Sequence, residues 1–267
     1  MKEEINVEDL IVQCREGSDE QKCSAIVELE EMGAKEAVPV LLELLDFPDE
    51  GVRANVASAL GKLGNKNVGK KLLTLLDDSD SLVRTEAVES LGLLRYVEAI
   101  PAISSLLETD EDPLVRLSAA EALGAIADVK ALPSLLKALN DQDEGVRAYA
   151  ADSIGSLGVV EANSILCQKL ASEPSLLTKT FILAALYRLG HKESLFSLVK
   201  LLETADYNLA VTILNLTNEL ANHQNSTYLR EKLQELTKSR PSLDPNQPLY
   251  PNVSSLIKRL ESLELTV

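Results

Sequence analysis

The sequence predicts an all-α protein built from about seven helix–turn–helix repeats that stack into a solenoid. Three observations predict this fold: a motif that recurs at a fixed period, a helix-capping residue before each copy, and the composition of the core. The 267 residues are 45% hydrophobic but only 3% aromatic, with no Trp. The core must therefore be formed by Leu, Ala, Val and Ile, and a chain this apolar is expected to fold rather than stay disordered.

The recurring motif reads Asp-x-x-Val-Arg, followed by small and apolar residues and a closing Leu-Gly or Ile-Gly. Successive arginines are spaced 31, 32 and 31 residues apart. A fixed period of this length is the signature of stacked repeats, because one helix pair cannot bury its apolar face alone. The clear copies contain Arg53, Arg84, Arg116 and Arg147, and weaker copies at Lys22, Lys179 and Ala210 extend the series to seven units.

Each unit has a residue suited to begin a helix four positions before its basic residue. Such a side chain accepts a hydrogen bond from an unpaired N–H of the first helical turn, which stabilises the helix by about 1 kcal/mol. The second helix of each unit is therefore expected to begin directly after this residue. The seven predicted N-caps are Ser18, Asp49, Asp80, Asp112, Asp143, Ser175 and Asp206.

Small residues are expected to shape the ends and the packing of these helices. Glycines that can adopt the left-handed conformation are predicted to end them, at Gly33, Gly64, Gly158 and Gly190. An alanine recurs at one position of four second helices and is predicted to let neighbouring helices approach closely, at Ala57, Ala87, Ala119 and Ala150. Shorter first helices precede the second ones, at Ala37–Leu45, Val68–Leu76, Ala99–Leu107 and Ala131–Leu139.

The two ends differ from the middle and are predicted to cap a single continuous core. Residues 1–17 are expected to form an N-terminal capping helix, residues 18–222 the repeats, and residues 223–267 C-terminal capping helices. A Pro-rich linker, about 239–251, divides the C-terminal part, because four prolines interrupt any helix there. The last predicted helix, Val253–Leu263, either folds back on the stack or docks on a partner or a second copy.

The repeat motif resembles HEAT repeats, in particular the short HEAT-like repeats of phycobilin lyases. The resemblance extends from Ser18 to Ala221 and is closest over Ala37–Gly158. It implies a right-handed α-solenoid superhelix whose second helices line the concave face. It also implies a structural ladder in which the repeat arginines pair with acidic residues of the inter-repeat turns, namely Arg53, Arg84, Arg116 and Arg147.

Charge and motif content exclude several classes of function. The formal charge of −16 argues against non-specific nucleic-acid binding and against docking on anionic membranes. The sequence contains no run of about 20 apolar residues, so no membrane insertion is expected. The three cysteines lack the spacing of a metal site, so no metal is expected, and no catalytic motif is present. Reduced thiols and an acidic N-terminus without an apolar stretch predict a cytoplasmic protein.

A candidate binding track follows the concave face, at the positions two and five residues after each basic residue. Its middle is acidic and its later part aromatic, and exposed Tyr and Arg are typical of binding hot spots. For Phe181 and Tyr187 the alternative is that they fill core space in a degenerate repeat. The candidate residues are Asn55, Glu86, Glu89, Glu121, Tyr149, Asp152 and Phe181, together with Tyr187 and Arg188 nearby.

These observations predict a non-enzymatic scaffold or adaptor that binds another protein with a basic or mixed-charge face and needs no cofactor. The resemblance implies an alternative: a phycobilin lyase subunit, or another factor that attaches or removes a linear tetrapyrrole bilin. In that case Tyr149, Asp152 and Arg188 are the residues expected to contact the bilin. Recognition of alkylated DNA is disfavoured by the charge of −16. The sequence leaves the oligomeric state open.

Overall fold

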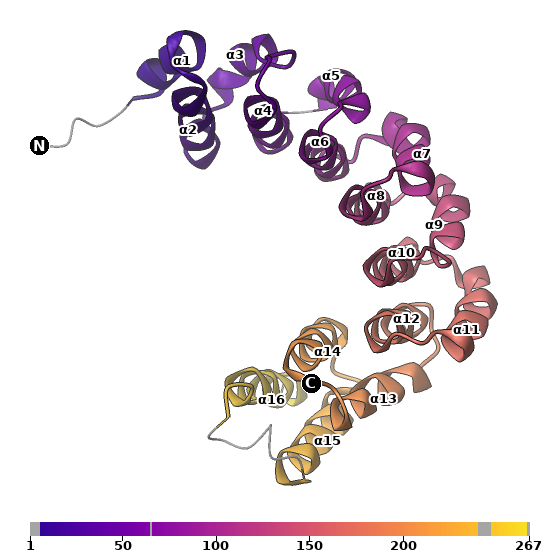
Figure 1. The fold of residues 1–267 in the computed structure, drawn as a ribbon. Coiled ribbons are helices and arrows are strands. Elements are labelled where there is room, and N and C mark those ends of the chain that lie inside the picture. The colour runs from indigo at the N-terminus through magenta and orange to yellow at the C-terminus, as the bar shows by residue number, and fades with distance from the viewer. Residues whose placement is uncertain (1–5, 65, 240–246, 266–267) are drawn as a thin grey trace, which may run out of the picture. The chain divides into compact units, whose positions relative to one another are not determined.

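The computed structural model describes residues 6–64, 66–239 and 247–265. Over these residues the chain forms α-helices and short 3₁₀-helices and no β-strand (Figure 1). Most of the helices come in pairs, a short first helix and a longer second one. The protein is therefore an all-α solenoid, as the repeat predicts.

The chain divides into two compact units, Met1–Ser153 and Ile154–Val267. The boundary falls within one helix, α10 (Glu144–Leu157). The continuity of the core from one unit to the other stays a prediction. Each repeat of a solenoid packs only on its neighbours, so the fold does not require one core to extend through the whole chain.

In the first unit the helices form two layers (Figure 1). The even-numbered layer holds the second helices of the repeats, and each of its members packs on the next one. These are α2 (Asp19–Glu31), α4 (Glu50–Leu63), α6 (Ser81–Leu93) and α8 (Pro113–Ile126). The other layer comprises α1 (Val7–Glu16), α3 (Val38–Glu43), α5 (Gly69–Leu72), α7 (Ile100–Thr109) and α9 (Leu132–Ala138).

Of the four predicted first helices, three are shorter than predicted, whereas α7 extends to Thr109, two residues beyond its predicted end. Each is preceded by a 3₁₀ turn, and the predicted helix Val68–Leu76 contains only one α-helical turn, α5, between 3₁₀ segments. The second helices begin where the capping residues predict. Each predicted N-cap accepts a hydrogen bond from the backbone N–H two or three residues later, which confirms all seven: Ser18, Asp49, Asp80, Asp112, Asp143, Ser175 and Asp206.

The prediction of left-handed glycines at helix ends is wrong at one position. Gly64 has a φ of −77° and is not left-handed. A Cβ atom there would lie 2.3 Å from the carbonyl oxygen of Leu60, so this position requires glycine for space. The other predicted glycines have positive φ angles, namely Gly33, Gly158 and Gly190.

Glycines allow neighbouring second helices of the first unit to approach closely. A Cβ atom on Gly92 of α6 would lie 2.8 Å from the Cα atom of Ala122 in α8. Gly61 and Gly124 have the same position in their repeats and equally close neighbours. The carbonyl of Ala57 accepts a hydrogen bond from Ser90 of the next second helix at 2.8 Å. The predicted alanines are fully buried, and their role in close approach stays a prediction, at Ala57, Ala87, Ala119 and Ala150.

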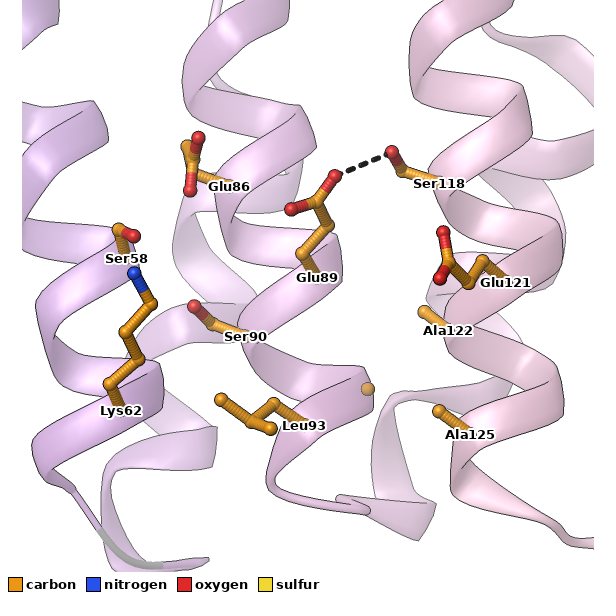
Figure 2. Close-up of a pocket in the computed structure, with 11 residues that line it drawn as sticks. Ser58, Lys62, Glu86, Glu89, Ser90, Leu93, Ser118, Glu121, Ala122 and Ala125 are labelled. Atoms are coloured by element: carbon orange, nitrogen blue, oxygen red, sulfur yellow. Dashed lines mark hydrogen bonds between the residues drawn. The ribbon is translucent and has the colours of Figure 1, made fainter. Parts of the chain in front are cut away.

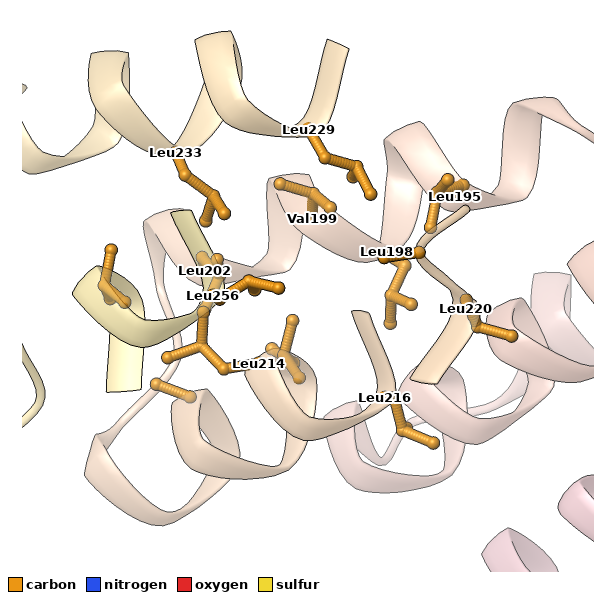
Figure 3. Packing of buried hydrophobic residues seen from close by; sticks show 14 of the residues in the cluster. Leu195, Leu198, Val199, Leu202, Leu214, Leu216, Leu220, Leu229, Leu233 and Leu256 are labelled. Carbon is orange, nitrogen blue, oxygen red and sulfur yellow. The ribbon is translucent and has the colours of Figure 1, made fainter. Parts of the chain in front are cut away.

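The second unit contains a leucine-rich core (Figure 3). The core is shared by the helices from α12 to α16, and it includes Leu198, Leu214, Leu233 and Leu256. Because α16 packs on α14 and α15, the last helix folds back on its own chain. The helices of this unit are α11 (Asn163–Ser172), α12 (Leu176–Arg188), α13 (Glu193–Lys200), α14 (Tyr207–Leu220), α15 (Ser226–Ser239) and α16 (Tyr250–Glu264).

The last helix begins earlier than the proline pattern predicted. It starts at Tyr250, and Pro251 lies in its first turn. A proline is tolerated there because its missing N–H would have no partner within the helix. The predicted linker therefore ends before residue 250. Pro241 and Pro245 lie outside the described residues.

Candidate functional site

In the first unit, the arginines of the repeat motif bind the turn of the following repeat. The Nε and Nη2 atoms of Arg84 donate to the two carboxylate oxygens of Asp110, both at 2.8 Å. Its Nη1 donates to the carbonyl oxygens of Asp78 and Ser79, at 2.9 and 3.2 Å, in the turn before its own helix. The same bidentate geometry joins Arg53 to Asp78 and Arg116 to Asp141.

These ion pairs are largely buried, and the aspartates also bind backbone. The side chains of Arg84 and Asp110 are 11% and 4% exposed. An oxygen of Asp110 accepts from the N–H of Asp112, the next N-cap, at 2.9 Å. The hydrogen bond from Arg53 lowers the pKa of Asp78 below its ordinary value. Arg147 likewise binds its preceding turn, through the carbonyl of Asp141 at 2.8 Å. These arginines thus fasten repeats together.

The first repeat uses different residues at the same two positions. Lys22 replaces the arginine, and its Nζ donates to the carbonyl oxygens of Cys14 and Arg15 at 2.9 and 2.7 Å. The aspartate is replaced by Phe47, whose ring centroid lies 5.5 Å from that ammonium. A cation–π contact, which is weaker than a buried bidentate pair, therefore takes the place of the ion pair in this repeat.

The acidic part of the predicted track lines one open pocket of about 330 Å³ on α4, α6 and α8 (Figure 2). Glu89 and Glu121 lie on facing sides of α6 and α8, and Glu89 accepts a hydrogen bond from Ser118 at 2.8 Å. Glu86 lies on the side of α6 nearer α4. Below the carboxylates, the pocket is lined by apolar side chains, Leu93, Ala122 and Ala125.

The carboxylates of this pocket have little compensating positive charge. Burial raises the pKa of Glu86, the charge of Glu89 raises it further, and a hydrogen bond from Ser58 offsets part of this. Burial also raises the pKa of Glu121, again with a contribution from Glu89. Lys62 lines the pocket too, but its ammonium forms an ion pair with Glu30 of α2. The pocket therefore favours the approach of a cation.

Other predicted track residues of the first unit lie outside this pocket. Asn55 lines a separate shallow pocket beside Cys23. Tyr149 and Asp152 lie on α10, next to Glu121. Burial raises the pKa of Tyr149, and the charges of Glu121 and Asp152 raise it further.

The last three predicted residues lie in the second unit and are held by contacts there. The hydroxyl of Tyr187 accepts hydrogen bonds from Asn225 and Asn222, at 2.7 and 3.3 Å. Arg188 forms an ion pair with Glu219 at 2.8 Å, and Phe181 packs against the leucine-rich core. The structure thus unites Glu86, Glu89 and Glu121, and leaves the binding roles of the other predicted residues as predictions.

The sequence did not lead us to predict one set of residues that line the pocket. Lys62, Leu93 and Ala125 each come nine residues after the arginine of their repeat. On a helix, this position lies one turn beyond the predicted positions two and five, on the same face. The helical period of the repeats could therefore have predicted these pocket residues.

Glu86→Gln is expected to raise the free energy of unfolding at pH 7.5, by an amount on the order of 0.5 kcal/mol. A carboxyl whose pKa is raised by folding stabilises fully below its unfolded pKa and loses that contribution as pH rises. The gain should therefore disappear near pH 4, where both states of the wild-type carboxyl are largely protonated. Urea unfolding at both pH values measures it. Glu98→Gln, at an exposed site in the first unit, is the control and should show no such difference.

Within the described ranges, no three His, Cys, Asp or Glu side chains are grouped so that they could hold a metal ion. None of the helices described here combines the length and apolar character that a bilayer span requires.

Comparisons with known proteins agree with this architecture. Similar solved structures include the complex of CpcE and CpcF of phycocyanin lyase from Nostoc sp. PCC7120, at 19% identity and a TM-score of 0.55 over 96% of this chain and 95% of that chain. An engineered protein matches at 23% identity and a TM-score of 0.54, over 70% of this chain and 99% of that chain. A designed armadillo repeat protein in complex with the peptide (KR)4 matches at 22% identity and 0.50, over 70% and 100%. At these identities the likeness is one of fold.

The sequence comparisons identify the repeats. A search of the curated proteins finds no significant match. The family described as HEAT repeats matches residues 7–92, 69–145 and 132–217, which together cover most of the chain. The protein therefore belongs to the HEAT-repeat family.

Proposed function

We propose that this protein is a non-enzymatic scaffold or adaptor whose acidic pocket on α4, α6 and α8 binds a basic segment of a partner protein. The observation that carries the proposal is that the carboxylates of Glu86, Glu89 and Glu121 line one open pocket. The lysine of this pocket is engaged by Glu30. Carboxylates held together without sufficient counter-charge reduce stability, and such groups are concentrated at functional sites. We also propose that the protein acts in the cytoplasm, as the sequence predicts.

The lining of the pocket suits a lysine or arginine side chain. Such a side chain combines an apolar stem with a cationic head. Leu93, which is 61% exposed, offers apolar surface for the stem, together with Ala122 and Ala125. The carboxylates of Glu86, Glu89 and Glu121 would then surround the cation. The formal charge of −16 would also accelerate the approach of a basic partner.

The test measures binding of a fluorescently labelled (KR)4 peptide to the full chain by anisotropy. We expect salt-sensitive binding that weakens at least about tenfold, or 1.4 kcal/mol, in the triple variant Glu86→Gln/Glu89→Gln/Glu121→Gln. The control variant Glu36→Gln/Glu98→Gln/Glu161→Gln removes the same charge at exposed positions outside the pocket. Equal weakening in both variants would show that net charge alone attracts the peptide, and would contradict the proposed site.

A linear tetrapyrrole is the alternative ligand, and the phycocyanin lyase complex has a similar fold over nearly the full length of both chains. Tyr149 and Asp152 adjoin the acidic pocket, and Arg188 lies in the second unit. The two proposals are separated by mixing the protein with phycocyanobilin and recording visible absorbance. Peptide binding without a spectral change supports the scaffold. A spectral change without peptide binding supports the tetrapyrrole alternative.

A further inference from the structure

One residue of the acidic pocket carries the same charge that the proposed partner would bring. Among the described residues that line the pocket, Lys62 on α4 is the only lysine or arginine. It comes nine residues after Arg53, and the next three arginine repeats have neutral residues at that position, Leu93, Ala125 and Ser156. The packing of the repeat therefore does not require a charged side chain there.

The ammonium of Lys62 interacts with carboxylates on both sides of its helix. On one side it forms an ion pair with Glu30 of α2. The hydrogen bond that it donates to Glu30 raises the pKa of Lys62 above its ordinary value, and the charges of Glu86 and Glu89 on α6 raise it further. Burial raises the pKa of Glu86, and the charge of Lys62 offsets part of this effect. Lys62 therefore already supplies part of the positive charge that the pocket attracts.

The ion pair with Glu30 does not fix Lys62 firmly. The side chain of Lys62 is 55% exposed, and that of Glu30 is 15% exposed. Pairs that reach solvent contribute at most about 1 kcal/mol. Figure 2 shows Lys62 extended along α4 toward Ser58, which donates a hydrogen bond to Glu86. Rotation about its own side-chain bonds can therefore move the ammonium toward the pocket carboxylates without movement of a helix.

We propose that Lys62 sets the affinity of the acidic pocket: its ammonium competes with the basic segment for Glu86 and Glu89. Glu30 limits this competition, because it holds the ammonium on the α2 side of α4. This inference rests on the proposed function, since it assigns the regulation of the same pocket. Loss of the charge on Lys62 therefore strengthens binding of the segment. Loss of the carboxylate of Glu30 weakens it, because the ammonium then turns to the pocket.

The experiment measures anisotropy of the labelled (KR)4 peptide with the full chain and with Lys62→Met, which keeps an unbranched side chain without the charge. At physiological salt we expect the variant to bind about three- to fivefold more tightly, the effect of one partly exposed charge. The control Lys70→Met makes the same change in net charge at an exposed position of α5, outside the pocket. Its effect should be small, because charges more than about 8 Å apart are largely screened. Lys62→Arg keeps the charge and should bind as the wild type does.

Two further variants show whether Lys62 acts through the pocket carboxylates. In the triple glutamine variant of the pocket, Lys62→Met should no longer strengthen binding. Glu30→Gln should weaken binding about twofold, more than Glu98→Gln does at an exposed site of the same unit. This loss should shrink in the Lys62→Met background, because Glu30 acts on the segment through Lys62.

A second measurement needs no peptide. Titration of the Glu86 side-chain carboxyl by NMR should show a pKa that rises in Lys62→Met and stays unchanged in Lys70→Met. A role of Lys62 in stability alone would not produce this difference, because it would not act on the charge of that carboxyl.

The outcomes separate this inference from the proposed function. Binding by Lys62→Met that is no tighter than binding by Lys70→Met would overturn the inference, and the proposed function would still stand if the triple glutamine variant lost the peptide. If neither the wild type nor Lys62→Met bound (KR)4, the proposed function would fail and this inference with it. Binding by Lys62→Met alone would support the competition, because Lys62 would then block the pocket of the wild type.

Discussion

Arg84→Ala is expected to lower the free energy of unfolding by about 3–5 kcal/mol, the loss typical when one member of a buried ion pair is removed. Arg84 is 9% exposed and the side chain of Asp110 only 4%. Without the guanidinium, the carboxylate of Asp110 stays buried with a backbone N–H as partner but without its bidentate ion pair, and only the more distant charge of Arg116 still acts on it. The substitution also removes the donor that binds the carbonyls of Asp78 and Ser79.

Urea unfolding followed by circular dichroism measures this loss, and an exposed ion pair of the same unit is the control. Lys137 pairs with Glu108 at 3.1 Å, but the lysine side chain is 68% exposed. Exposed pairs contribute at most about 1 kcal/mol, so Lys137→Ala should have a small effect. Similar losses in the two variants would show that burial does not strengthen the arginine pair.

A second variant separates the unpaired charge from the missing arginine contacts. Asp110→Asn in the Arg84→Ala background replaces the buried carboxylate with a neutral amide that can still accept from Asp112. We expect this double variant to recover part of the stability lost in Arg84→Ala. No recovery would indicate that the arginine acts chiefly through the turn carbonyls.

The parts of the fold that depend on local chemistry could be predicted from the sequence. An N-cap acts on an N–H two or three residues away, so Asp49 or Asp206 indicates a helix start without knowledge of the rest of the fold. Helix ends are less local. Arg95 and Ala127 have φ angles of 48° and 59° without being glycine, a conformation unfavourable for an L-residue that the surrounding packing must maintain.

The candidate site likewise has residues that the sequence could predict and contacts that it could not. Glu86, Glu89 and Glu121 follow from the helical period within each repeat, and the same period could have found Leu93. The pairing of Lys62 with Glu30 could not be predicted, because these residues are 32 positions apart on helices whose relative rotation depends on tertiary packing. Contacts between distant residues therefore required the structure.

Gly92→Ala is expected to lower the free energy of unfolding by about 1–3 kcal/mol, the usual cost of overpacking. Helix propensity alone predicts the opposite sign, because alanine is favoured over glycine within a helix by about 1 kcal/mol. The cost of overpacking should exceed the gain in helix propensity here, because the new Cβ atom would lie 2.8 Å from the backbone Cα atom of Ala122. The helices α6 and α8 would have to separate.

Gly51→Ala is the matched control for this substitution. Gly51 lies in the first turn of α4, where a Cβ atom would meet only side-chain atoms, the nearest being Oδ1 of Asp49 at 3.2 Å. This variant should be neutral or slightly stabilising in the same urea experiment. Ala122→Gly added to Gly92→Ala should restore part of the loss, because it removes one of the two close atoms. If Gly92→Ala instead stabilised the protein as propensity predicts, the glycines would not set the spacing of the repeats, and helix packing in the first unit would have to be explained by the arginine pairs alone.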